Sequence, residues 1–176
     1  MKPEASLRNE LCLQVAALML TAARTAPKAK GVDNLELAVI EPHEIEPIAL
    51  KMEAMASEFN APAFARDAGN IRQAQALVLL GTRIRSQGLI ICGRCGFPNC
   101  AEKNKHPMIP CTFNTGDLGI AIGSAVSVAM DHRVDNRIMY TVGQAAMELR
   151  LLGDDVPIIY GIPLSISSKN PFFDRK

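Results

Sequence analysis

The stretch Asp117-Leu-Gly-Ile-Ala-Ile-Gly-Ser-Ala-Val-Ser-Val-Ala-Met130 is the most apolar segment of the chain. Helical spacing places apolar residues such as Ile120, Val126 and Met130 on nearly every side of it, and such a helix must be buried all round. It is too short to cross a bilayer, which takes roughly 20 apolar residues. We therefore predict a buried helix over 117–130. A partner subunit in a homodimer is the favoured cover for it, and enclosure by its own chain is the alternative.

Amphipathic stretches and short apolar runs alternate on both sides of this helix. Apolar spacing and chain breakers predict the remaining elements: helices over 6–26, 44–59 and 144–152, strands over 35–40, 76–81 and 156–160, a short turn near Asn70, and a strand or helix start over 138–142. Because helices and strands alternate, the fold class is α+β or α/β. The 176 residues suit one domain spanning 1–176.

A cysteine motif precedes the apolar helix. It reads Cys92-Gly-Arg-Cys95-Gly-Phe-Pro-Asn-Cys100, and Cys111 follows after ten intervening residues. No secretory signal is visible at the N-terminus, so we expect a cytoplasmic protein, in which closely spaced cysteines indicate a metal or redox site. A cubane cluster takes four thiolates, and a Cys-x-x-Cys turn supplies two of them. We predict that 92–111 is a cluster-binding loop that holds one [4Fe–4S] cluster through these four cysteines.

The other residues of this loop indicate where a bound cluster would lie and which polar groups would surround it. Gly93 and Gly96 allow a tight turn with positive φ, whose amides would point at cluster sulfurs. The run from Glu102 to His106 is polar or charged and hard to bury, so we predict a cluster near the surface with a one-electron redox role. Lys103 and Lys105 would then steer an acidic electron-donor protein.

Other interpretations of the cysteines stay open. Four cysteines can hold structural zinc, although such sites usually pair two Cys-x-x-Cys knuckles and only one is present here. Disulfides or free thiols are the remaining option. His106 is either a substitute ligand or a solvated loop residue. Cys12 lies among apolar neighbours in the first helix and is predicted to be a small buried hydrophobic residue.

Composition argues against several classes of function. Net charge is +1 with scattered Lys and Arg, aromatic residues make up 5% and Trp is absent. A nucleic-acid-binding surface usually carries a basic patch or aromatic stacking platforms, so we expect no nucleic acid and no membrane among the partners. We find no Ser-His-Asp set, phosphate loop or Glu-x-x-His pair for hydrolytic or phosphoryl-transfer chemistry.

The motif, together with the Ala-Glu-Lys that follows Cys100, resembles the ferredoxin domain of corrinoid and carbon-monoxide-dehydrogenase partner proteins, where it binds [4Fe–4S]. Nearly the whole chain, including Gly161-Ile-Pro-Leu-Ser and Asn170-Pro-Phe-Phe-Asp-Arg175, resembles a bacterial and archaeal family of ferredoxin-domain-containing proteins, a domain of unknown function. That resemblance implies a cluster and no particular reaction.

The order of segments also resembles the nitroreductase family of dimeric FMN enzymes. The similarity rests on Ala23 to Asn34 followed by a strand, on the helix 117–130, and on Gly161-Ile-Pro near the C-terminus. It implies a mixed sheet flanked by helices with the cysteine loop inserted, a homodimer and an FMN-dependent oxidoreductase. The residues implied to bind the flavin are Arg24, Lys28, Lys30, Asn34 and Arg175.

This sequence departs from the nitroreductase pattern at its start. That family opens with an Arg-rich segment, and the first ten residues here hold only Arg8. Arg24, Lys28 and Lys30 either replace that segment or form a solvated loop. The competing function is a non-enzymatic interaction or sensor module, stabilised by a cluster or by zinc on the same scaffold.

Overall fold

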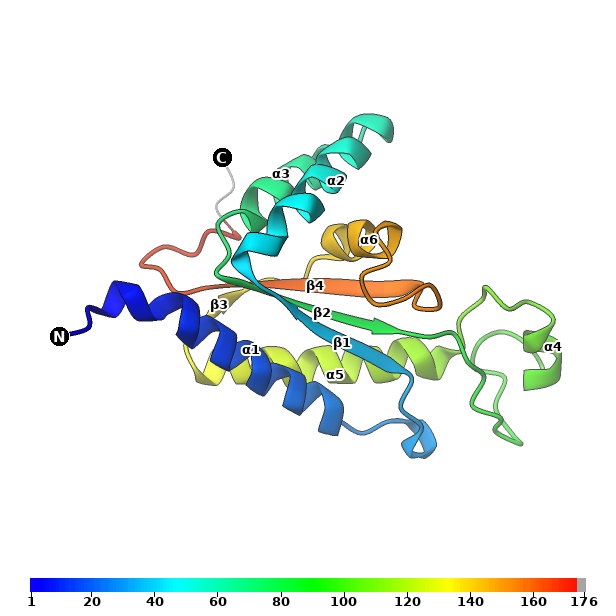
Figure 1. Cartoon of the computed structure of the whole chain (residues 1–176). Coiled ribbons are helices and arrows are strands. Elements are labelled where there is room, and N and C mark those ends of the chain that lie inside the picture. Colours follow the sequence, from blue (N-terminus) through cyan, green and yellow to red (C-terminus); the bar gives the residue numbers. More distant parts are fainter. Residues whose placement is uncertain (174–176) are drawn as a thin grey trace.

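A computed structural model of the chain describes residues 1–173 (Figure 1). The helices are α1 (Arg8–Thr25), α2 (Ile45–Glu58), α3 (Pro62–Ile71), α4 (Cys100–Asn104), α5 (Thr112–Asp131) and α6 (Tyr140–Glu148). The strands are β1 (Leu35–Ile40), β2 (Ala76–Thr82), β3 (Asp135–Asn136) and β4 (Ile158–Ser165). Single 3₁₀ turns are η1 (Glu4–Leu7), η2 (Ala29–Gly31) and η3 (Pro42–Glu44).

The strands form a four-stranded sheet in the order β1-β2-β4-β3. In the described part of the chain every strand pair is antiparallel, from Leu35 opposite Thr82 to Asn136 opposite Leu164. The predicted α+β class is therefore confirmed, while the predicted mixed pairing is wrong. Each strand runs in the direction opposite to that of its neighbour, because the chain between them returns to the same end of the sheet that it left.

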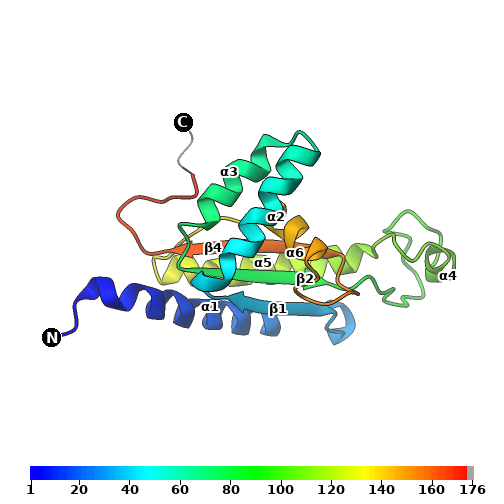
Figure 2. The same cartoon turned by 45° about the horizontal axis from the view of Figure 1, so that its top comes forward.

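Helices cover both faces of the sheet (Figures 1 and 2). All seven residues of β2 are buried, and their side chains alternate between the two faces. Val78 and Leu80 pack in one core with α1 and α5, whereas Leu77 and Leu79 pack in a second core with α2, α3 and α6. The molecule is thus three layers thick, with β2 at its centre.

Helix α6 lies unusually close to β4 because it carries a glycine at the contact. A Cβ added to Gly143 would come 1.7 Å from the carbonyl oxygen of Ile159. No side chain fits there, since real Cβ atoms do not approach backbone atoms so closely. Gly143 therefore fixes how deeply α6 sits against the sheet.

Most of the predicted elements are present. The strand over 35–40 is confirmed residue for residue, and the first two helices and the strand from 76 to 81 are confirmed within about two residues. Three boundaries were wrong. Residues 62–71 form the helix α3 rather than a short turn, because Pro62 occupies its first position, where no N–H is needed. Helix α6 begins at Tyr140 and ends at Glu148 instead of running to Leu152. The last strand begins at Ile158.

Helix α5 is longer than predicted, and its own chain does not enclose it. Ala121, Ala125 and Ala129 pack in the core, but the opposite side is open, with Ile120 47% and Met130 60% exposed. Gly119 and Gly123 share that open side. Among residues 1–173, no helix combines the length and apolarity that crossing a membrane requires.

Candidate functional site

The chain between β2 and α5 projects beyond the end of the sheet (Figures 1 and 2). We call residues 83–111 the cysteine lobe. Only Gln87, Lys103 and Cys111 are buried in it, and its apolar residues Ile90 and Ile91 are 99% and 93% exposed. The cysteine lobe therefore has no aliphatic or aromatic core of its own.

Hydrogen bonds tie the cysteine lobe to the rest of the protein. The Arg85 N–H donates to the Asn114 side chain at 3.0 Å, and the Lys30 ammonium donates to the Gln87 carbonyl at 3.2 Å. The Thr112 hydroxyl donates to the Arg94 carbonyl at 2.9 Å. These contacts hold both ends of the lobe against the N-terminal turns of α5 and against η2.

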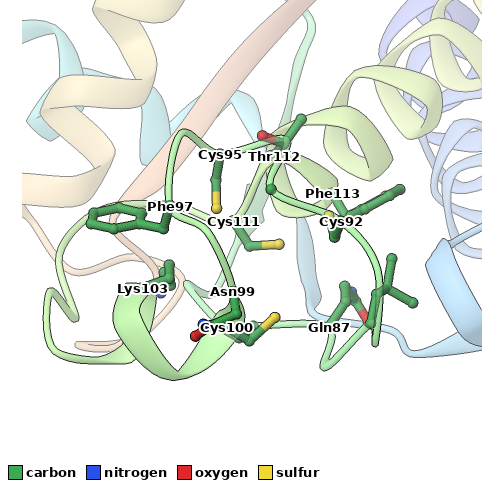
Figure 3. Close-up of a pocket in the computed structure, with 13 residues that line it drawn as sticks. Gln87, Cys92, Cys95, Phe97, Asn99, Cys100, Lys103, Cys111, Thr112 and Phe113 are labelled. Atoms are coloured by element: carbon green, nitrogen blue, oxygen red, sulfur yellow. The ribbon is translucent and has the colours of Figure 1, made fainter.

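The structure brings all four predicted cysteine ligands to one pocket. Cys92, Cys95, Cys100 and Cys111 line it, together with lobe residues and the start of α5. Figure 3 shows the sulfurs of Cys95, Cys100 and Cys111 pointing into a common space, with Cys92 beside it. The cavity between them has a volume of about 10 Å³. Cys111 is buried and the other three are half-buried, so the pocket lies close to the surface.

The turn between the first two cysteines depends on glycine. Gly93 and Gly96 have φ of 80° and 88°, as the sequence predicted. The Gly96 N–H donates to the Gly93 carbonyl at 3.1 Å. That amide is committed to closing the turn, so the prediction that it points at a bound sulfur is wrong for Gly96.

Helix α4 follows at once and orients Cys100 and Lys103. The Asn99 side chain accepts the Glu102 N–H at 2.9 Å and caps the helix. His106 stacks on Phe97 at a ring separation of 5.1 Å and is exposed, and it does not line the pocket. The structure therefore places His106 as a solvated loop residue rather than as a ligand.

The charges of the cysteine lobe differ from the sequence prediction. Lys105 is exposed and pairs with Glu102 at 2.9 Å. Lys103 is 3% exposed and lines the pocket, so the prediction that it steers a donor protein from the surface is wrong. Polar runs are usually solvated, but the capped turn of α4 rotates this one lysine inward.

Two side chains that sequence reasoning missed complete the pocket. Gln87 is 6% exposed and its side-chain N–H₂ has no partner, and the Lys103 ammonium makes no hydrogen bond or ion pair within residues 1–173. In the same residues no three His, Cys, Asp or Glu side chains are arranged to hold a single metal ion. The pocket thus offers four thiols, with the unpaired amide donor of Gln87 and the side chain of Lys103 beside them.

Arg24, Lys28, Lys30 and Asn34 do not line the cysteine pocket, and the charged groups of the first three bond to the protein itself. Arg24 pairs with Asp33 at 2.7 Å, and Lys28 donates to three carbonyls at the end of α1, including that of Ala23 at 2.8 Å. Asn34 is buried and its carbonyl accepts the Arg83 N–H at 3.0 Å. Lys30 reaches Gln87, as described above. Arg175 lies outside the described residues.

Asp117 of α5 connects this helix to η2, next to the predicted flavin-binding residues. Both carboxylate oxygens of Asp117 accept the Ala29 N–H at 3.1 Å. Burial raises the pKa of Asp117, while the Ala29 hydrogen bond and the charge of Lys28 oppose the rise. Burial in turn lowers the pKa of Lys28. Asp117 therefore fixes η2 against α5.

The fifth cysteine has a different environment. Cys12 is fully buried in the core between α1 and the sheet, as predicted, and its thiol faces the Gln75 side chain at 3.7 Å. Burial raises the pKa of Cys12 to about 11. The structure thus separates one inert core thiol from four pocket thiols.

The architecture matches solved flavoproteins. A BluB-like flavoprotein from Clostridium difficile 630 superposes with a TM-score of 0.59 over 93% of this chain and 84% of that one, at 18% identity. A nitroreductase from Desulfovibrio desulfuricans, solved in complex with FMN, gives a TM-score of 0.60 over 93% and 78%, at 13% identity. Fold and cysteine pocket together define a nitroreductase-like α+β protein that carries an added cysteine lobe.

Sequence comparison identifies the family. A protein of Archaeoglobus fulgidus, described as an uncharacterized protein, is 41% identical over 98% of this chain and 96% of its own length. Residues 108–175 match the model of the family "Uncharacterized protein containing a ferredoxin domain (DUF2148)". The chain belongs to this family, and the predicted resemblances to it and to the nitroreductase fold are confirmed. The matched segment contains Cys111 and begins after the other three pocket cysteines.

Proposed function

We propose that the protein is an iron–sulfur redox protein, whose pocket holds one [4Fe–4S] cluster through Cys92, Cys95, Cys100 and Cys111. The observation that carries the proposal is that four thiols from three different turns line one pocket, while the fifth lies in the core. When bound, such a cluster supplies reversible one-electron transfer. The ferredoxin-domain description of the family supports the same proposal.

The donor arrangement supports a cluster rather than zinc. A structural zinc site of four cysteines usually pairs two Cys-x-x-Cys knuckles, and only the one formed by Cys92 and Cys95 is present here. Cluster thiolates approach separate iron corners and therefore stand around a space. The half-buried Cys92, Cys95 and Cys100 keep that space near the surface, where a donor protein would deliver electrons.

A pair of matched variants tests the assignment. Cys95→Ala removes one pocket thiol, and Cys12→Ala removes the core thiol, so both lose one sulfur. Prepared anaerobically, the wild type and Cys12→Ala should show broad visible absorption that dithionite bleaches reversibly, and Cys95→Ala should lose it. Equal spectra for the two variants, or a wild type that dithionite cannot reduce, would contradict the redox assignment.

We further propose that the protein acts as a homodimer through α5. The open side of this helix carries the exposed Ile120 and Met130, and a groove of about 180 Å³ is lined by Gly119, Ile138 and Tyr160. Large apolar side chains that are exposed together usually mark a surface that a partner covers.

A pair of matched variants tests the dimer. Ile120→Glu should shift sedimentation from dimer to monomer. Leu50→Glu, an equally exposed site on α2 in the opposite layer, should leave the dimer intact.

A flavin at this dimer interface is the enzymatic extension of the proposal. It is supported by the fold, which the FMN-bound Desulfovibrio desulfuricans protein shares. Arg24, Lys28, Lys30, Asn34 and Arg175 remain the proposed contacts, and Arg24 and Lys30 would exchange their present bonds to Asp33 and Gln87 for flavin oxygens. Added FMN should bind to the dimer, and Arg24→Ala should weaken binding at least about tenfold, a loss of about 1.4 kcal/mol. An FMN titration that shows no binding would contradict the flavin extension and leave the cluster protein without an enzymatic site.

A further inference from the structure

The buried lysine of the cysteine lobe lacks a counter-charge. Lys103 is 3% exposed and lines the cysteine pocket, and its ammonium has no hydrogen bond or ion pair within residues 1–173. A buried cation is strongly unfavourable unless an anion and hydrogen-bond acceptors compensate it. The groups that share its pocket and can become anionic are the four cysteine thiols. A negatively charged group held by these sulfurs would supply the counter-charge that Lys103 lacks.

A second group in the same pocket has an unused donor. Gln87 is 6% exposed, and its side-chain N–H₂ finds no acceptor, whereas its backbone carbonyl accepts a hydrogen bond from the Lys30 ammonium. Buried polar groups are almost always paired, so an orphan donor points to an acceptor that is still missing. In the view of Figure 3, Gln87 and Lys103 lie on opposite sides of the cysteine sulfurs. Two independent observations therefore indicate the same kind of occupant, one that is negative and accepts hydrogen bonds.

We propose that Lys103 and Gln87 stabilise the negative charge of the cysteine-bound cluster and set its reduction potential. The inference rests on the proposed function. Lys103 supplies a fixed positive charge, and Gln87 supplies an N–H donor toward sulfur. Both kinds of group are known means by which proteins tune cluster potentials.

The direction of the effect follows from electrostatics. An electron accepted from dithionite, or from a low-potential donor protein, adds one negative charge to the pocket. A nearby positive charge in a poorly solvated site favours that added charge, so Lys103 raises the reduction potential. Lys105 carries the same charge only two residues away, but it is exposed and paired with Glu102. Solvent and salt screen such a charge, which makes Lys105 the matched control.

The experiment compares the wild type with Lys103→Met, Lys103→Arg, Lys105→Met and Gln87→Leu, all prepared anaerobically as the full chain. Iron and sulfide are counted first, and the potential is then measured by reductive titration. At a fixed solution potential, Lys103→Met should lower the ratio of reduced to oxidised cluster at least about tenfold, which is about 59 mV for a one-electron couple. Gln87→Leu should lower it by a smaller factor. Lys103→Arg and Lys105→Met should stay within about twofold of the wild type.

The outcomes separate this inference from the proposed function. A wild type without iron and sulfide overturns the cluster assignment itself. A loaded Lys103→Met whose potential equals that of Lys105→Met overturns only the role of Lys103. Loss of iron from Lys103→Met but not from Lys103→Arg supports a role for the charge, whereas loss from both shows that positive charge alone does not hold the cluster and overturns the inference.

Discussion

The cysteine lobe and the three-layer body are built on different physical principles. The body buries two apolar cores on either side of β2, with side chains such as Leu77 and Leu80 fully enclosed. The cysteine lobe leaves Ile90 and Ile91 in solvent and buries only a cysteine, a lysine and a glutamine. Apolar burial is the main favourable term in folding. The body therefore holds its own shape, whereas the lobe needs another source of stability, and metal binding coupled to local folding is one.

Removal of the proposed cluster should produce the largest difference between the two regions. Chelation or oxidative stripping should abolish hydrogen-exchange protection of amides in the cysteine lobe, because their opening free energy then falls toward zero. Amides of β2 and α5 should keep their protection. A lobe that stays equally protected after stripping would show that it folds unaided, and the contrast drawn here would fail.

Overcrowding α6 should disturb the body and spare the lobe. Gly143→Ala places a methyl group against the Ile159 carbonyl, and we expect a loss of about 3 kcal/mol or more in unfolding free energy. Gly69→Ala is the matched control, since its added methyl meets nothing within 4 Å in helix α3, and it should stabilise by roughly 0.5–1 kcal/mol. Urea unfolding measures both variants. Equal stabilities would contradict the tight contact between α6 and β4.

Alkaline pH should distinguish the core thiol from the pocket thiols. Cys12 has a folded pKa of about 11, above its ordinary value of 9.0, so the folded state favours the neutral thiol. Its contribution is complete below about pH 9 and is lost as pH rises through about 11, a change of roughly 2–3 kcal/mol. Urea unfolding across this window should show a shallower decline for Cys12→Ala. Parallel curves for wild type and variant would contradict the assigned burial effect.

Loss of the α4 cap should give the smallest effect, confined to the lobe. Asn99→Ala removes the acceptor of the Glu102 N–H, which typically costs about 1 kcal/mol. In the loaded protein, exchange of the α4 amides should accelerate about fivefold, while the body amides stay unchanged. Acceleration across the body would mean that the two regions unfold together.

Much of the body was predictable because its signals are local. Alternating and compact apolar runs located β1 and β2, and the helical spacing of apolar residues located α1, α2 and α5. The cysteine spacing predicted the residues that the structure gathers at one pocket. Strand pairing was not predictable in the same way, because the order β1-β2-β4-β3 joins segments distant in sequence.

The remaining errors arose where tertiary contacts override local preference. Lys103 belongs to a polar run that composition places in solvent, yet the capped turn of α4 turns it into the pocket. The positive residues near the end of α1 remain proposed flavin contacts, but the sequence could not indicate their present partners: Lys28 donates to helix carbonyls and Arg24 pairs with Asp33. Sequence alone gives the residue types of such groups and not their partners.

The central claim is that four pocket thiols hold one cluster, and one measurement tests it most directly. Iron, acid-labile sulfide and zinc are quantified on a single anaerobically purified sample of the wild type. We predict about four irons and about four sulfides per chain, with little zinc. Stoichiometric zinc without sulfide would contradict the claim and would make the cysteine lobe a zinc-stabilised module.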